Sequence, residues 1–323
     1  MQIFHSLDEA RAAHNGRPIA ATVGNFDGVH RGHQLMFAEL TRCARERNIP
    51  AVAVTFQPHS LRVLRPHTGF RLLTPLPQKL ELLAATGLDA AIVLPFTPEF
   101  AAISARSFTA DILRDALRVS TMVEGASFRF GHHAELGAED LAVLGLEMGF
   151  DVAILPPLTV RGDVISSSRI RHLISHGLVH HARALLGRLF SISGRPAPGR
   201  GYGSRFTVPT INLGPYDELL PAHGVYVTRI TVGAGPAAPT LDAVTNIGNR
   251  PTFGADSFSV ETHILDFQPV TLDESTPIKI DFLFRLRGEV RWPNAEALKA
   301  QIALDVKRAR RSLQLLHHLH PQA

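Results

Sequence analysis

Five short apolar runs lie in the first half of the chain, separated by segments of helical length and periodicity. Each run is almost continuously apolar, which is typical of parallel strands covered by helices on both faces. The pattern predicts a doubly wound α/β domain. The predicted strands are Ile19 to Val23, Ala51 to Phe56, Ala90 to Leu94, Val119 to Val123 and Val152 to Leu155.

The pattern changes in the second half. The spacing is helical from Ser166 to Arg188, and beyond it β-branched runs such as Gly224 to Val232 and Ile278 to Phe284 alternate with Gly- and Pro-rich segments. This predicts an antiparallel β-barrel, followed by a helix from about Asn294 to Leu319 that begins with an Asn cap. Because one core rarely organises 323 residues, we predict two domains, residues 1–186 and residues 187–323.

Composition narrows the class of protein. Hydrophobic residues make up 45% of the chain and charged residues 19%, which excludes a largely disordered protein. The 33 Lys and Arg against 29 Asp and Glu give a net charge of +4, which is too small to indicate a nucleic-acid partner, and we expect none. Small phosphorylated molecules fit this charge equally well.

The cysteine count, the hydropathy and the histidine spacing argue against a disulfide, a membrane segment and a histidine metal site. The single cysteine, Cys43, excludes an intrachain disulfide and is interpreted as a packing residue on an amphipathic helix. With no signal-peptide pattern and no apolar segment near the ~20 residues of a membrane helix, we expect a cytoplasmic protein without a membrane partner. Three histidine pairs lack the spaced ligands of a metal site and are interpreted as surface residues: His132–His133, His180–His181 and His317–His318.

A glycine-rich segment between the first predicted strand and the next helix is the first candidate phosphate site. Glycines allow the backbone to approach a phosphate, and a helix start supplies free N–H groups and partial positive charge. His30 and His33, three residues apart, can share one side of the first helical turn. By itself, such a Gly-rich segment is better explained as a tight strand-to-helix turn with exposed histidines. The expected ATP contacts here are Gly24, Asn25, Phe26, Asp27 and Gly28.

The combination H-x-G-H at this place resembles the nucleotidylyltransferase superfamily, and the string G-N-F-D-G-V-H-R-G-H resembles the adenylyltransferase half of bacterial riboflavin kinase/FAD synthetases. The resemblance implies that His30 and His33 contact the ATP phosphates and stabilise charge on the transferred group. The segment from Val164 to Arg171 resembles the superfamily's I-S-S-[ST]-x-I-R signature. It implies that Ser166, Ser167 and Ser168 bind ATP and that Arg171 stabilises pyrophosphate.

Parts of the first domain depart from the family pattern. Ser127 stands where the family usually has Asp or Asn, the segment from His132 to Gly137 follows in a different register, and Ser60 replaces a usual proline. In the family the region around Ser127 contributes to flavin binding. An alternative is therefore a riboflavin kinase whose first domain is impaired in FMN adenylylation or acts on another phosphorylated acceptor.

The second candidate phosphate site cannot be a P-loop, because no G-x-x-x-x-G-K-[ST] occurs. A Gly-rich stretch that includes Gly199 precedes the P-T-x-N tetrapeptide, which presents the hydroxyl of Thr210 and the amide of Asn212. Mg²⁺ that carries ATP phosphates needs oxygen ligands and keeps several waters, so these two residues suffice. An ordinary turn also explains an isolated P-T-x-N.

Two later strings, N-x-G-x-x-P-T-F from Asn246 and E-x-H-x-x-D-F from Glu261, follow in the order of the riboflavin kinase barrel, which the second half resembles. The resemblance places Glu261 as the base for the riboflavin 5′-hydroxyl, Thr210 and Asn212 at Mg²⁺ and ATP, and Gly199 at ATP. A structural carboxylate paired with a surface Lys is the alternative for Glu261. Thr207–Val208 replaces the family's Gly-Phe before the P-T.

The resemblance spans about Ile19 to Arg310 and implies a bifunctional enzyme with Mg²⁺ as cofactor and ATP, riboflavin and FMN as substrates. A non-enzymatic flavin- or nucleic-acid-binding regulator is the hypothesis from a different class. Turnover of ATP separates the two.

Overall fold

The computed structural model describes residues 1–197, 210–249, 258–266 and 273–319. Contacts divide the chain into two compact units, Met1–Ser167 and Ser168–Ala323. Helices α8 (Ser167–Ser175) and α9 (Val179–Leu186) largely belong to the second unit, although the predicted boundary lies after them. The division at residues 186 and 187 stays a prediction.

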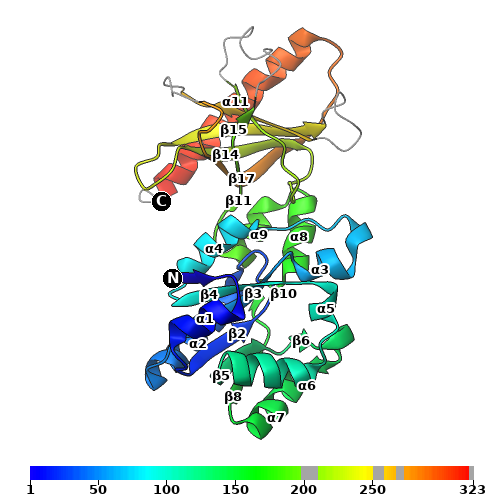
Figure 1. Cartoon of the computed structure of the whole chain (residues 1–323). Helices are drawn as coiled ribbons and strands as arrows, with labels where there is room; N and C mark the ends of the chain where they lie inside the picture. The colour runs from blue at the N-terminus through cyan, green and yellow to red at the C-terminus, as the bar shows by residue number, and fades with distance from the viewer. Residues whose placement is uncertain (198–209, 250–257, 267–272, 320–323) are drawn as a thin grey trace. The chain divides into compact units, whose positions relative to one another are not determined.

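The first unit is built on a six-stranded parallel sheet in the order β1-β4-β3-β2-β5-β8 (Figure 1). All five predicted strands are confirmed. They are β2 (Ile19–Val23), β3 (Ala51–Gln57), β4 (Ala90–Pro95), β5 (Val119–Gly125) and β8 (Asp151–Leu155). The edge strand β1 (Gln2–Phe4) was not predicted.

Helices cover both faces of this sheet, as the continuous apolar strands require. On one face, strand residues such as Ala21 and Val54 pack against α1 (Leu7–His14), the π-helical segment η2 (Phe108–Ala116) and α7 (Ala138–Met148). On the other face, Ala20 and Ala53 pack against α2 (Arg31–Arg47) and α4 (Leu76–Ala84). The doubly wound prediction is therefore confirmed.

Short elements complete the first unit. The helical ones are α3 (Ser60–Leu64), η1 (Pro66–Thr68), α5 (Pro98–Ala101), α6 (Ala105–Ser107) and η3 (His132–Ala134). Two small hairpins pair β6 (Arg129–Phe130) with β7 (Leu136–Gly137) and β9 (Thr159–Val160) with β10 (Asp163–Val164).

The second unit contains a seven-stranded antiparallel sheet in the order β11-β17-β14-β15-β16-β13-β12. The two edge strands, β11 (Phe190–Gly194) and β12 (Pro196–Ala197), are separated in the chain by Arg195 alone. Because one residue joins its opposite edges, the sheet must curl round on itself, as the barrel prediction requires. The other strands are β13 (Thr210–Leu213), β14 (Gly224–Val232), β15 (Thr240–Asn249), β16 (Phe258–Ile264) and β17 (Ile278–Gly288).

The C-terminal helix α11 (Ala295–Leu319) begins as predicted, with the Asn294 side chain accepting a hydrogen bond from the Ala297 N–H at 2.8 Å. Its apolar residues Ala309 and Leu313 are buried against one face of the sheet, in a cluster with Val227 and Val244. On the opposite face of the sheet, Tyr226 and Phe282 are completely buried.

Candidate active sites

The predicted phosphate turn lies at the carboxyl end of β2, between this strand and α2. Gly28 has a φ of +85°, and a Cβ on Gly24 would come within 2.8 Å of the Phe26 ring. Phe26 itself has a φ of +47°, a left-handed conformation that is uncommon outside glycine. The Gly28 N–H donates to the Thr74 hydroxyl at 2.9 Å. The backbone of the turn is therefore held by Thr74, which lies almost fifty residues further along the chain.

Two of the predicted ATP contacts use their side chains to hold this turn. The buried carboxylate of Asp27 accepts hydrogen bonds from the Leu73 N–H at 3.0 Å and the Thr74 N–H at 3.0 Å. The Asn25 amide donates to the Ser60 hydroxyl at 2.8 Å and accepts from the Ser60 N–H at 3.1 Å. Ser60, a departure from the family pattern, thus supports the turn. These side-chain bonds favour main-chain contacts from the turn to a phosphate.

The predicted histidine pair lies at the start of α2. His30 is the N-cap, and its Nδ1 accepts from the His33 N–H at 3.3 Å. The two rings are stacked with their centroids 3.6 Å apart, and the Phe26 ring stands edge-on to His33 at 5.3 Å. Because Nδ1 of His30 accepts, its proton is assigned to Nε2, which can donate to an anion. The arrangement combines imidazole donors with the positive end of a helix.

The serine signature contacts the turn at one point. The Ser167 hydroxyl donates to the main-chain carbonyl of Asp27 at 2.8 Å. Ser166 precedes α8, and both serines are half-buried. Ser168 and Arg171 belong to the second compact unit, and their contacts with ATP stay predictions.

Two buried charged residues near the turn were not predicted from the sequence. Lys79 of α4 is 5% exposed, and its Nζ donates to the Asn25 carbonyl at 3.1 Å and the Thr55 hydroxyl at 2.9 Å. Burial lowers its pKa to about 8, against the opposing charge of Asp27. Lys79 and Leu83 are the buried residues of α4 and lie four positions apart, on one side of the helix. The sequence pattern that could have predicted this buried lysine is its place on the apolar side of an amphipathic helix.

Glu124 is the second such residue. It lies on β5 and is 1% exposed, and its Oε1 accepts from the Val23 N–H at 2.6 Å and the Thr22 hydroxyl at 3.3 Å. Burial raises the pKa of this carboxyl well above its ordinary value. In the sequence this carboxylate directly follows the apolar pair Met122 and Val123 of a predicted strand. Glu124 ties β5 to the last residue of β2, directly before the turn.

The region with the altered family pattern forms the β6–β7 hairpin. Ser127 is exposed, while Phe128 and Phe130 stack at 5.5 Å against the core. The part that this region plays in flavin binding stays a prediction.

Strand register assembles the second candidate site. Asn212 of β13 lies directly opposite Glu261 of β16, and Asn246 of β15 lies opposite Glu261 on its other side. Directly opposed residues project to the same face of a sheet, and so do Thr210 and Asn212, which are two positions apart. The register therefore brings Thr210 and Asn212 of the P-T-x-N tetrapeptide together with Glu261 of a later motif, and adds Asn246.

The Glu261 side chain is exposed, and no hydrogen bond or ion pair to it is found within the described ranges. The alternative of a carboxylate paired with a surface Lys thus finds no support there. Its neighbour in the motif, Asp266, instead pairs with Arg310 of α11 at 2.6 Å. Gly199, Thr207–Val208 and the P-T-F that follows Arg250 lie outside the described residues.

The opposite face of the same strands carries a chain of buried hydroxyls. Thr228 and Thr245 lie 2.8 Å apart and Thr245 and Thr262 3.0 Å apart, measured between their Oγ1 atoms. All three residues are completely buried. Satisfied polar networks specify one packing arrangement, so these three hydroxyls hold the register of β15 and β16 that sets Glu261 opposite Asn246.

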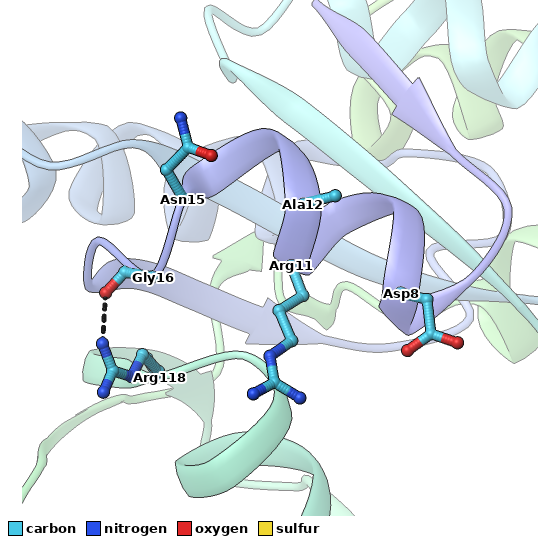
Figure 2. Close-up of a pocket in the computed structure, with 6 residues that line it drawn as sticks. All are labelled: Asp8, Arg11, Ala12, Asn15, Gly16 and Arg118. Carbon is cyan, nitrogen blue, oxygen red and sulfur yellow. Dashed lines mark hydrogen bonds between the residues drawn. The ribbon is translucent and has the colours of Figure 1, made fainter.

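A hollow on the first unit lies away from the turn. The hollow has a volume of about 480 Å³, and Figure 2 shows the residues that line it. Among them, the Arg118 guanidinium donates a hydrogen bond to the Gly16 carbonyl at 2.6 Å. Arg118 directly precedes β5 and Gly16 lies three residues before the start of β2, whereas the turn follows β2. Ligands of doubly wound sheets bind at the carboxyl ends of strands, so this hollow is not part of the candidate site.

The other sequence expectations concern metals and membranes. All six residues of the three histidine pairs are exposed, and across the described ranges no group of three or more His, Cys, Asp or Glu could hold a metal. Cys43 lies on α2, is half-buried and forms no disulfide. Of the helices in the described part of the chain, none has the length and apolarity needed to span a bilayer.

Comparisons with known proteins agree with both halves of this description. A family model described as FAD synthetase matches residues 12–169, and one described as riboflavin kinase matches residues 186–313. The bifunctional riboflavin kinase/FMN adenylyltransferase of Escherichia coli K12 is 35% identical over 290 residues, 90% of this chain and 91% of the relative. The Pseudomonas fluorescens protein of the same name is 33% identical over 311 residues, 96% and 97% of the two chains.

Among solved structures, a Streptococcus pneumoniae protein described as a macrolide-efflux protein has a TM-score of 0.82 and 27% identity, over 91% of this chain and 94% of that one. Its likeness extends over both units. With relatives of this identity along nearly its whole length, the chain belongs to the family of bifunctional riboflavin kinase/FMN adenylyltransferases.

Proposed function

We propose that this protein phosphorylates riboflavin to FMN with its second unit and adenylylates FMN to FAD with its first, using ATP in both reactions. The observation that carries the proposal is the presence of two phosphate-handling arrangements, one in each unit: the turn and histidine pair after β2, and the carboxylate, amide and hydroxyl row on β16 and β13. Nothing favours the alternative of an impaired first domain. The cytoplasm, where ATP is abundant, is the compartment we propose.

In the adenylylation, a phosphate oxygen of FMN attacks the α-phosphorus of ATP and pyrophosphate leaves. Negative charge grows on the α-phosphoryl oxygens and on the leaving pyrophosphate. His30 and His33 donate hydrogen bonds to these oxygens, and the N–H groups of the turn and of the start of α2 add partial positive charge. We assign Ser166, Ser167, Ser168 and Arg171 to the β- and γ-phosphates.

In the kinase reaction, the 5′-hydroxyl oxygen of riboflavin attacks the γ-phosphorus of ATP, the hydroxyl proton passes to the Glu261 carboxylate, and ADP leaves. Thr210 and Asn212 lie two positions apart on β13, with Asn212 opposite Glu261. The hydroxyl of Thr210 and the amide oxygen of Asn212 are hard oxygen donors of the kind that Mg²⁺ prefers. Thr210 and Asn212 would hold the ion, which when bound neutralises charge on the ATP phosphates. Gly199 is assigned to ATP.

Two variants test the division of labour. His33→Ala should slow FAD formation from supplied FMN by about 10²–10³, the usual effect of losing one preorganised donor, and leave riboflavin phosphorylation unchanged. Glu261→Gln keeps the shape of the side chain but cannot accept the proton, so it should slow riboflavin phosphorylation by about 10²–10⁴ and leave FAD formation unchanged.

Each variant is the control for the other. The assay separates riboflavin, FMN and FAD by chromatography at saturating ATP and Mg²⁺. Equal loss of both half-reactions in either variant, or wild-type turnover in both, contradicts the assignment of the two reactions to these sites.

A further inference from the structure

The side chain of Lys79 lies beneath the phosphate turn and contacts its backbone. Its Nζ donates to the main-chain carbonyl of Asn25 at 3.1 Å and to the Thr55 hydroxyl at 2.9 Å. The Thr55 hydroxyl also donates to the Asn25 carbonyl, at 3.3 Å. Lys79 is thus joined directly to the peptide group between Asn25 and Phe26.

This contact fixes the direction of a backbone donor. The Asn25–Phe26 peptide is trans, since the one cis bond in the described residues is Gln57–Pro58. The C=O and N–H of a trans peptide point in opposite directions. With the carbonyl held towards Lys79, the Phe26 N–H is directed away from it. Within the described part of the chain this N–H has no hydrogen-bond partner, although Phe26 is only 2% exposed.

The charge of Lys79 is poorly compensated by the protein. Its two partners are neutral oxygens, and no carboxylate in the described residues pairs with it within 4.0 Å. The carboxylate whose charge acts on Lys79 is Asp27, which is already occupied by the N–H groups of Leu73 and Thr74. Burying an ammonium group without a counter-charge is unfavourable.

Of the other titratable groups next to the turn, burial raises the pKa of the Glu124 carboxyl well above its ordinary value, which favours its neutral form. The histidines bring no negative charge. His30 and His59 are the N-caps of α2 and α3, and each accepts a backbone N–H at Nδ1, as a neutral imidazole does. His33 is stacked on His30. Asp27 acts on Lys79 without an ion pair in the described residues, so we expect a bound anion to supply a closer counter-charge, and the polyphosphate of ATP is an anion that binds at such turns.

We propose that Lys79 is a positioning residue for the adenylylation reaction, which holds the Asn25–Phe26 peptide with its N–H towards the ATP phosphates and whose buried positive charge the bound triphosphate balances. The inference depends on the proposed ATP site in the first unit. It adds to the histidine pair a residue that acts through the turn and from a different helix.

A coupling between ATP binding and protonation follows. In the free protein, burial holds the pKa of Lys79 near 8, so the ammonium loses its proton as the pH rises through this value. A bound triphosphate favours the charged form and raises the pKa. ATP binding above pH 8 must therefore take up a proton, and the KM for ATP in FAD formation should rise by up to about tenfold per pH unit from pH 8.

The test uses the full chain with supplied FMN and measures kcat and the KM for ATP in FAD formation between pH 7 and 10. Lys79→Met should raise this KM at pH 7 by about tenfold or more, the effect of removing a charge-assisted interaction, and should remove the alkaline rise. Lys79→Arg keeps the charge at every pH, so it should recover part of the affinity and also lack the alkaline rise.

Two controls accompany these variants. Riboflavin phosphorylation at the same pH values should be unchanged, and Lys307→Met, which removes an exposed lysine of α11, should behave like the wild-type protein. The inference is overturned if Lys79→Met retains the wild-type KM for ATP, or if Lys79→Arg retains the wild-type rise of this KM at alkaline pH. The second outcome tests the inference even if the Met variant does not fold. A wild-type protein that makes no FAD would overturn the proposed ATP site together with the inference.

Discussion

The ion pair between Arg287 of β17 and Asp305 of α11 gives a stability prediction that can be worked out from the geometry. The guanidinium donates to Asp305 Oδ2 through Nε at 2.9 Å and lies 2.8 Å from it through its second terminal nitrogen. Gln301 donates to Oδ1 at 2.8 Å. The side chains are 19% and 4% exposed, so the pair is largely withdrawn from water.

Arg287→Ala removes both donors to Oδ2 and leaves a buried carboxylate that retains only Gln301. Breaking a buried pair in this way destabilises a protein by about 3–5 kcal/mol, because the remaining charge is uncompensated. Replacing both partners with apolar residues, as in Arg287→Met with Asp305→Leu, should be less damaging than Arg287→Ala alone, because no charge is left behind.

The assay is urea unfolding followed by the fluorescence of Trp292, the single tryptophan of the chain, which lies in the second unit beneath the Arg287 guanidinium at 5.7 Å. The matched control is Arg310→Ala, which removes an ion pair to Asp266 whose side chains are 51% and 79% exposed and should change the free energy of unfolding by less than about 1 kcal/mol. Equal effects of Arg287→Ala and Arg310→Ala, or a double variant less stable than Arg287→Ala, would refute the reasoning.

Three further predictions concern the two sites. Burial raises the pKa of Glu124, so the folded protein holds a proton that the unfolded chain loses above about pH 4.5; stability should fall with rising pH in the wild-type protein but not in Glu124→Gln, as urea unfolding at several pH values can show. Burial lowers the pKa of Lys79 from 10.5 in the unfolded chain to about 8 in the folded protein, so between these pH values the unfolded chain binds more protons. The free energy of unfolding of the wild-type protein should therefore rise with pH across this window, by up to about 3 kcal/mol relative to Lys79→Met, as circular dichroism melts can show. Asn212→Ala should raise the Mg²⁺ concentration needed for riboflavin phosphorylation and leave FAD formation unchanged, and equal Mg²⁺ dependence in variant and wild type would speak against Asn212 as a ligand.

Most of the architecture could be predicted because it depends on local pattern. Continuous apolar runs identified the five central strands, and the Asn294 cap identified the start of the last helix. Strand β1 (Gln2–Phe4) was missed because it is short and mostly exposed, and an edge strand of three residues leaves no periodic signal.

The candidate sites were predictable as motifs but not as contacts. The turn is held by Thr74 and Lys79, about fifty residues away in the chain, and only the fold brings them beneath it. The sequence likewise places Asn246, Glu261 and Asn212 on separate segments, and only the register of β15, β16 and β13 sets them in one row. Buried titratable residues such as Glu124 are hard to predict, because their neighbours are set by tertiary packing.

The central claim is that one chain carries both reactions in sequence, and a product time course tests it most directly. The purified protein is incubated with riboflavin, ATP and Mg²⁺, and the flavins are separated at intervals. We predict that FMN appears first and that FAD follows at its expense, with ADP and pyrophosphate as co-products. Absence of FMN, or FMN that accumulates without any FAD, would contradict the account.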